Sequence, residues 1–394
     1  MSLTQDAQTL APELTALRHE LHQIPEIGLQ LPQTQAAILR ALEGLPLRIV
    51  TGTSTTSVVA VLEGARPGPV VLLRGDMDAL PVAENTGLDF AATNGNMHAC
   101  GHDLHVTGLV GAAKLLSGRR AELAGSVVFM FQPGEEGFAG ARYMLEEGLL
   151  EVAGQKPVAA YGLHVFPGPL GQFEYRPGPL MAGANELTIT VRGRGGHGSR
   201  PQDAVDPVAP LVAIASELQT MVTRRFDVFD PVVLTITRLR AGEAHNVIPD
   251  SASLGATVRT LSAESTRRME EEATRLATSI AAGFGASAEV DFAVNYPVTV
   301  NDAAETAWAA EQLGEEFGAD KLVPLVNPMM GSEDFSFVLQ EVPGTFMFMG
   351  ASPAGLDPEN LAWNHSPEVV FDDAALPIQA AALARLAIER LARG

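Results

Sequence analysis

The sequence predicts an α/β protein built on a mostly parallel sheet, with a ferredoxin-like α+β domain inserted into it. Along the first part of the chain, helical patterns alternate with short apolar strands, which is typical of a parallel sheet covered by helices on both faces. Between about 183 and 295 the strands instead alternate apolar and polar residues. Their order there, strand-helix-strand-strand-helix-strand, is that of a ferredoxin-like unit.

The first domain is expected to comprise residues 1–182 and 296–394. Leu14, Leu17 and Leu21 fall at helical spacing until Pro25 ends the pattern, and short apolar runs mark the strands that follow. In order, we expect helices and strands at 14–24 (helix), 34–43 (helix), 57–62 (strand), 70–73 (strand), 103–116 (helix), 127–131 (strand), 141–146 (helix) and 159–165 (strand). After Asn301 the domain resumes with a helix at 303–317, a strand at 346–349 and a helix at 374–393.

The inserted domain is expected to span residues 183–295 and to act as a lid or a dimerisation domain. Its first strand shows Leu187, Ile189 and Val191 alternating with polar residues, so one of its faces should be wet. A helix at 206–221, strands at 232–239 and 251–259, a helix at 264–282 and a strand at 290–294 complete the unit.

Composition excludes several classes of function. The chain has 394 residues, 46% of them hydrophobic and 19% charged, which indicates a globular protein rather than a disordered one. Its net charge of −21 argues against nucleic acid or an anionic membrane as a partner. The N-terminus does not look like a signal peptide, and the single cysteine suits a reducing compartment, so we expect a cytoplasmic protein.

Polar side chains follow the predicted parallel strands where those strands end. Asp76 and Asp78 follow one strand, Glu135 and Glu136 follow the next, and His164 ends a third. Because ligand sites in such sheets lie beyond the carboxyl ends of the strands, these residues are candidates for a common site. A solvated acidic loop or a structural histidine would explain each of them taken alone.

The strongest local signal is the segment 98–105, which contains His98, Cys100, His102 and His105. A lone cysteine is usually a small buried hydrophobe, but a thiol next to imidazoles at a loop-to-helix junction favours metal ligation. Not every histidine of this group can be a ligand. Together with glutamate and with His365 near the C-terminus, the donors would suffice for two metals bridged by the thiolate, which indicates hydrolysis.

A second unusual segment is the glycine-rich stretch 193–198, which contains His197. A turn alone would explain its glycines. A histidine among four glycines nevertheless suggests a side chain that reaches a ligand.

Eight sequence blocks then resemble the two-metal amidohydrolases that include hippurate hydrolase, N-acyl-amino-acid amidohydrolases and auxin-conjugate hydrolases. The resemblance covers nearly the whole chain and rests on the blocks 21–26, 74–81, 98–103, 132–136, 195–201, 244–250, 331–335 and 364–367. The wider superfamily has His-x-Asp where this chain has Asp76-Met77-Asp78, and this departure matches the branch whose metals are bridged by cysteine.

The resemblance implies a site and a mechanism. Cys100 would bridge two divalent ions (zinc, manganese, cobalt or nickel), with His102 and His164 on one ion and Glu136 and His365 on the other. Glu135 would be the general base and Asp78 would orient a ligand. His197 would stabilise the developing oxyanion, from a neighbouring subunit of a homodimer or homotetramer. Asn246 and Arg259 would bind the carboxylate of an N-acyl amino acid substrate.

Other functions stay open at this point. An N-acetyl-diaminopimelate deacetylase or a dipeptidase would use the same site. A thiol hydrolase would use Cys100 as nucleophile with a histidine as base. A ligand-binding relative without activity is a further alternative, although the presence of Glu135 and of every candidate ligand argues against it.

Overall fold

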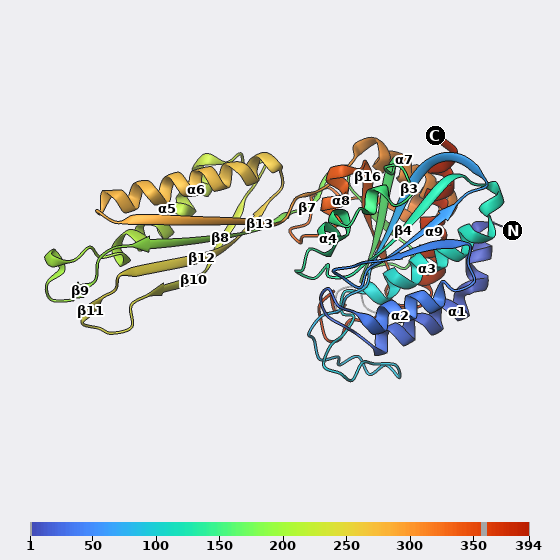
Figure 1. The fold of residues 1–394 in the computed structure, drawn as a ribbon, viewed down its shortest axis with the longest axis horizontal. Coiled ribbons are helices and arrows are strands. Elements are labelled where there is room, and N and C mark those ends of the chain that lie inside the picture. Colours follow the sequence, from blue (N-terminus) through green and yellow to red (C-terminus); the bar gives the residue numbers. More distant parts are fainter. Residues whose placement is uncertain (1, 356–360, 394) are drawn as a thin grey trace. The chain divides into compact units, whose positions relative to one another are not determined.

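The computed structural model describes residues 2–355 and 361–393, and its contacts divide the chain into two units (Figure 1). The first unit consists of Met1–Leu180, Val300–Asn327 and Asp334–Gly394. The second consists of Met181–Thr299 and Pro328–Glu333, so it takes in a short later segment besides the predicted insertion. None of the helices in the described residues is long and apolar enough for a membrane span.

The first unit is built on an eight-stranded sheet in the order β1-β2-β4-β3-β5-β16-β6-β15. The strands are β1 (Leu47–Thr51), β2 (Val58–Glu63), β3 (Arg66–Asp76), β4 (Ala124–Gln132), β5 (Ala159–Phe166), β6 (Phe173–Tyr175), β15 (Leu322–Pro324) and β16 (Gly344–Gly350). The central strands β4, β3, β5 and β16 run parallel, and β15 runs parallel to β6. The pairs β1–β2, β2–β4 and β16–β6 are antiparallel. The predicted mostly parallel sheet is therefore confirmed, and the outer strands β1, β6 and β15, of which β1 and β15 form the edges, are additions that the sequence patterns did not reveal.

Helices lie on both sides of this sheet (Figure 1). The long helices α1 (Leu3–Gln23), α3 (His102–Gly118) and α9 (Ala375–Arg393) pack against one another, with α2 (Pro32–Ala41) and α7 (Ala303–Phe317) beside them. The short helices α4 (Gly140–Glu146) and α8 (Ser336–Glu341) pack together elsewhere in the unit. Nearly every residue of α3 is buried, because this helix lies between the sheet and the other helices and is apolar on all sides.

Helix α1 begins eleven residues earlier than its hydrophobic pattern predicted, at Leu3 instead of Leu14. Ser2 and Gln5 form a capping box at its first turn, and Leu3 and Ala7 are buried. Capping and burial therefore extend the helix through Pro12.

The second unit has the predicted ferredoxin-like order. Its sheet, β10-β12-β8-β13, is antiparallel and consists of β8 (Gly183–Arg192), β10 (Val233–Ala241), β12 (Ser251–Thr260) and β13 (Ser287–Tyr296). Helices α5 (Val208–Arg225) and α6 (Ala263–Gly283) pack on one face, where Leu187, Leu254 and Met269 belong to the core. The side chains of the other face stay exposed or half-buried.

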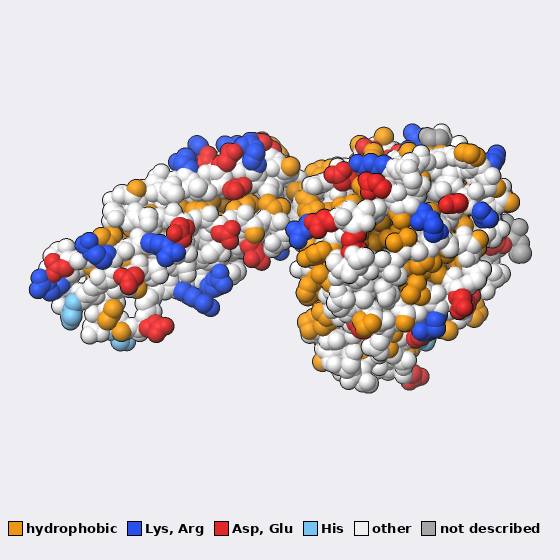
Figure 2. Space-filling model, in the orientation of Figure 1, with side chains coloured by type: hydrophobic (Ala, Val, Ile, Leu, Met, Phe, Trp, Pro, Cys, Tyr) orange, Lys and Arg blue, Asp and Glu red, His pale blue; other side chains and the backbone are white. Residues whose placement is uncertain are grey.

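Short elements complete the structure. Two-residue strands β9 (Gly196–His197) and β11 (Val247–Ile248) pair with each other, and β7 (Gly178–Met181) and β14 (Thr299–Asn301) lie where the chain passes between the units. The 3₁₀ turns are Arg120–Glu122, Leu149–Glu151, Pro201–Asp203 and Ala319–Lys321. On the face shown in Figure 2, basic and acidic side chains are interspersed.

Candidate metal centre

Three neighbouring parallel strands bring candidate ligands together at their carboxyl ends. β3 ends at Asp76, β4 ends shortly before Glu135 and Glu136, and β5 carries His164 near its end. Because β4, β3 and β5 are adjacent and parallel, their carboxyl ends meet, as the sequence predicted.

Gly101 fixes the loop that presents Cys100 and His102. It precedes α3 with a φ of 84°, a conformation that favours glycine, and a Cβ at this position would lie 2.3 Å from Cγ2 of Val165. The Asn364 amide donates to the carbonyl oxygens of Cys100 and Val165, at 3.2 Å each. The cysteine loop, β5 and the C-terminal segment are thus held together around the thiol.

All five predicted ligands lie together in two groups that share Cys100. One group joins Cys100 with His102 and His164, the other joins it with Glu136 and His365, and the donor atoms within each group lie within 4.8 Å of one another. The Cys100 Sγ atom is 3.4 Å from His164 Nε2 and 3.3 Å from His365 Nε2. His365 Nε2 is 3.2 Å from Glu136 Oε1.

These separations match those of donors on one tetrahedral ion. With bonds of about 2.0 to 2.3 Å to nitrogen, oxygen and sulfur, two donors of a tetrahedral zinc lie roughly 3.3 to 3.8 Å apart. The pairs Cys100–His164, Cys100–His365 and Glu136–His365 therefore already lie at about the spacing that a metal ion needs.

The histidine nitrogens are also oriented for ligation. The Nδ1–H of His164 donates to the carbonyl oxygen of Val165 at 2.8 Å, which leaves the Nε2 lone pair facing Cys100. Burial lowers the pKa of His164, so its ring is neutral and able to bind metal. Both ring nitrogens of His102 are buried, and neither makes a hydrogen bond within the described residues, although carboxylates of Asp76 and Asp78 lie 3.3 Å and 3.6 Å away.

His365 adopts a strained backbone conformation at this site. It has a φ of 72°, which is uncommon for a residue other than glycine, and its N–H donates to the Ala99 carbonyl oxygen at 2.8 Å. Hydrogen bonds to Cys100 and Glu136 raise its pKa to about 10. A positive charge is therefore favoured beside the Glu136 carboxylate at this point.

Asp78 organises the two adjacent glutamates. Its carboxylate accepts the backbone N–H groups of Glu135 and Glu136 at 3.0 Å each, and its Oδ1 lies 3.6 Å from His102 Nδ1. The Glu136 carboxylate lies with the donor atoms of Cys100 and His365. The Glu135 carboxylate lies near His102 and Glu136 but is not part of the Cys100 groups. Two neighbouring carboxylates are thus available for different roles.

His105 and Asp76 form a buried support that sequence reasoning did not assign. His105 Nδ1–H donates to Asp76 Oδ1 at 2.6 Å, and His105 Nε2 accepts the Val165 N–H at 2.8 Å. Both nitrogens are occupied, so His105 is not a ligand. Asp76 Oδ2 lies 2.6 Å from the Arg74 guanidinium and 3.3 Å from His102 Nε2. The position of Asp76 at a strand end was the available signal.

His98 lies apart from the two donor groups. It is buried, and burial lowers its pKa to about 3, so its ring is neutral.

An aromatic cluster, consisting of Phe166, Phe348 and Trp363, borders the centre. The ring centroids of His164 and Phe348 are 5.8 Å apart, those of Phe166 and Phe348 6.3 Å, and those of Phe166 and Trp363 6.0 Å. Trp363 is 53% exposed and lies two residues from His365, whose side chain is also exposed. The sequence analysis did not identify this apolar wall, because its members come from three distant segments.

The remaining three predicted residues belong to the second unit. His197 and Asn246 line one cavity of about 490 Å³, next to the pairing of β9 with β11. The His197 Nδ1 atom accepts from the backbone and the hydroxyl of Ser199. Arg259 lies near the other end of β12 and donates to the Thr257 hydroxyl at 2.8 Å. The structure therefore brings His197 and Asn246 together but not Arg259.

Comparison with known proteins gives the family. The sequence model of peptidase family M20/M25/M40 matches residues 72–389. The chain belongs to this family. It is accordingly a metal-dependent hydrolase of the amidohydrolase type.

Relatives match this M20 chain over nearly its whole length. It is 38% identical to the N-acetylcysteine deacetylase of Bacillus subtilis (95% of this chain, 96% of that one) and 36% identical to an IAA-amino acid hydrolase of Arabidopsis thaliana (96% and 86%). A solved structure, the Bacillus subtilis YXEP protein, described as a dinuclear metal binding peptidase from the M20 family, superposes with a TM-score of 0.83 at 35% identity (98% and 99%).

Proposed function

We propose that this M20 hydrolase cleaves the amide bond of N-acyl amino acids to a carboxylic acid and a free amino acid, with two divalent ions per subunit. The observation that carries the proposal is the pair of donor groups that share Cys100. Cys100, His102 and His164 would hold one ion, and Cys100, Glu136 and His365 the other. The thiolate favours zinc, while manganese, cobalt and nickel accept the same donors.

The chemistry is divided between the ions and Glu135. Bound at this site, the ions polarise the amide carbonyl and acidify a water molecule. The Glu135 carboxylate accepts the proton of that water as it attacks, and then donates it to the nitrogen of the departing amine. Asp78 holds the Glu135 backbone, so it sets the direction of this carboxylate.

The two halves of the substrate differ in the chemistry that they need. The acyl group is apolar, and the Phe166, Phe348 and Trp363 cluster supplies an apolar surface beside His164. The amino acid half carries a carboxylate, for which the second unit offers Arg259 and Asn246 as donors.

His197 and Asn246 lie too far from Arg259 within one copy of the second unit for all three to contact one small substrate. Arg259 lies eight positions after Ser251 on β12, and Ser251 is near the His197 cavity. At the usual rise of a strand these eight positions span about 26 Å. A small substrate that touches both groups would need two subunits, with His197 and Asn246 from one and Arg259 from the other. This separation supports a homodimer or homotetramer with a composite site.

A thiol hydrolase is the alternative that the geometry also accommodates. Cys100 Sγ lies within 3.4 Å of a histidine nitrogen on either side, as a nucleophile needs. A thiol mechanism would leave His102 and Glu136 without a role, which favours the two-metal mechanism. The two-metal mechanism requires Cys100 as an unoxidised thiolate. Because a reducing compartment keeps the thiol in this state, the proposal includes a cytoplasmic location.

A substrate panel tests the proposal. Purified protein with a defined metal content is assayed against N-acetyl, N-benzoyl and N-octanoyl amino acids, dipeptides and N-acetyl-diaminopimelate, beside Glu135→Gln as the inactive control. We expect the highest kcat/KM on an N-acyl amino acid. Preference for a dipeptide or for N-acetyl-diaminopimelate would replace the proposed substrate class by that runner-up.

A further inference from the structure

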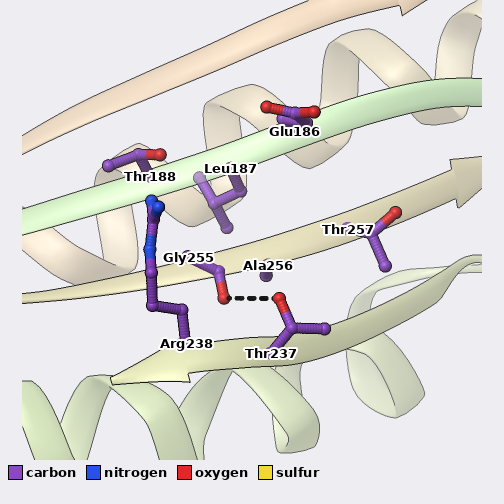
Figure 3. A pocket seen from close by; sticks show the side chains of 8 residues that line it. All are labelled: Glu186, Leu187, Thr188, Thr237, Arg238, Gly255, Ala256 and Thr257. Atoms are coloured by element: carbon purple, nitrogen blue, oxygen red, sulfur yellow. Dashed lines mark hydrogen bonds between the residues drawn. The ribbon is translucent and has the colours of Figure 1, made fainter. Parts of the chain in front are cut away.

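The open face of the sheet in the second unit contains a second candidate binding site, far along the chain from the metal ligands. Its cavity, of about 240 Å³, is lined mainly by Glu186, Thr188, Thr237, Arg238, Gly255 and Thr257 (Figure 3). α5 and α6 pack on the opposite face of the sheet. The lining is polar, which is unlike the apolar pocket of a hydrophobic ligand.

A β-bulge turns Arg238 into this cavity. In β10, Ile236 pairs with Ala256, but Arg238 pairs with Gly255, so Thr237 is an extra residue in the strand. Regular pairing would place Arg238 opposite Leu254, whose side chain is in the core. The bulge therefore moves the guanidinium from the helix-covered face to the open face.

Gly255 makes room for that guanidinium. A Cβ at this position would lie 2.9 Å from Arg238 Nη2 and 3.0 Å from Nε, so the side chain lies directly on the glycine backbone. Glycine in the middle of a central strand weakens the strand and marks close approach of another group. Figure 3 shows Arg238 crossing the strand toward Thr188.

The Arg238 guanidinium has no partner within residues 2–355 and 361–393. Several other arginines of the unit are paired, such as Arg192 with Glu289, Arg225 with Glu272 and Arg267 with Glu264. Arg238 makes neither a hydrogen bond nor an ion pair with Glu186, although both line the same cavity. Its donors are thus available to a ligand, and a carboxylate matches them in a bidentate manner.

The positive charge of Arg238 and the negative charge of Glu186 lie on neighbouring rows of cross-strand pairs, on the open face of the sheet. Arg238, Gly255, Thr188 and Asp291 form one row of cross-strand partners, and Thr257 and Glu186 belong to the next row on this face. A ligand between them meets a cation on one side, a carboxylate on the other, and threonine hydroxyls between. A plain anion would be repelled by Glu186, whereas a zwitterion satisfies both groups.

We propose that this cavity binds a free α-amino acid, with its carboxylate on Arg238 and its ammonium group near Glu186. The cavity volume suits a molecule of that size. The inference rests on the second unit alone and does not depend on the proposed hydrolase activity.

Binding is tested on the full-length metal-loaded protein with glycine and L-alanine, and with acetate and methylamine as the two half-ligands. The readout is the NMR signal of the Thr188 and Thr257 methyl groups, which report on this cavity and not on the metal centre. We expect saturable shifts with the amino acids. Arg238→Met should weaken them roughly 10- to 100-fold, the range for a hydrogen bond to a charged group. Arg240→Met, an exposed arginine of the same strand, is the matched control.

Two further variants keep the test decisive if Arg238→Met folds poorly. Gly255→Ala should weaken binding with Arg238 retained, because the new Cβ displaces the guanidinium. Glu186→Gln should weaken L-alanine binding and leave acetate binding unchanged or stronger. Absence of methyl shifts in the wild type, or equal losses in Arg238→Met and Arg240→Met, would overturn the proposal.

Discussion

Asp103 Oδ2 lies 2.8 Å from Nδ1 of His22, so helix α1 is joined to the first turn of α3 directly beside His102. Arg18 of the same helix donates to this oxygen at 2.8 Å, and His22 Nε2 lies 3.1 Å from Glu84. His22, Arg18 and Asp103 are buried. The N-terminal helix thus supports the segment that carries two candidate ligands.

This contact predicts a pH dependence of stability. Burial alone lowers the pKa of His22, but the charge of Asp103 and the hydrogen bonds to Asp103 and Glu84 raise it to about 9. A histidine with a raised folded-state pKa stabilises the fold fully below its unfolded pKa of about 6.5 and loses this contribution as pH rises through 9. The stability difference between wild type and His22→Gln should therefore shrink by about 3 kcal/mol between pH 6 and 10.

Urea denaturation of both proteins, at equal metal content across this pH range, measures that difference. His245→Gln, an exposed histidine of the second unit, should show no such trend. A constant difference between wild type and His22→Gln from pH 6 to 10 would mean that His22 is not held in its charged form.

Glu135 and Glu136 offer a matched pair of variants. Glu135→Gln should keep its metals but lose turnover by ~10² to 10⁴, because an amide does not accept the proton of water. Glu136→Gln should lose metal as well as activity, because it removes a donor. Metal analysis and kcat separate the two outcomes, and near-normal kcat in Glu135→Gln would point to another base.

Trp363 should control the preference for the acyl group. Trp363→Ala should lower kcat/KM for an N-benzoyl amino acid by about tenfold relative to the N-acetyl derivative of the same amino acid, because an aromatic contact is lost. Trp363→Phe should restore most of the ratio, and Phe284→Ala, an exposed aromatic of the second unit, should not change it. An equal loss on both substrates would mean that the aromatic cluster does not receive the acyl group.

His197 should act on the substrate from a partner subunit. His197→Ala should keep both metals and lose catalysis. Mixing it with inactive Glu135→Gln should restore activity, up to one working site per hybrid dimer, because one site then has both residues intact. If subunits exchange and no activity returns, His197 does not act across the subunit interface.

Hydrophobic periodicity in the sequence predicted most of the helices and strands, but it predicted few of the contacts that form the site. The buried parallel strands and α3 were predictable because their apolar runs are long, whereas β6 and β15, of three residues each, leave no pattern. Donor chemistry and the family resemblance predicted the grouping around Cys100. The support by Asp76 and His105, and the wall of Phe166, Phe348 and Trp363, depend on contacts between distant segments and were missed. The β10 bulge was also missed, because one extra residue in an exposed strand leaves no mark on its composition.

Metal titration of the stripped protein tests the central claim most directly. We predict that chelator-treated protein is inactive on N-acyl amino acids and that activity returns in proportion to added metal until two ions are bound per chain. Cys100→Ala should bind fewer than two ions under the same conditions, because the donor shared by both groups is gone. Full activity of the stripped wild-type protein, lost only when Cys100 is replaced or alkylated, would contradict the metal mechanism and establish a thiol hydrolase.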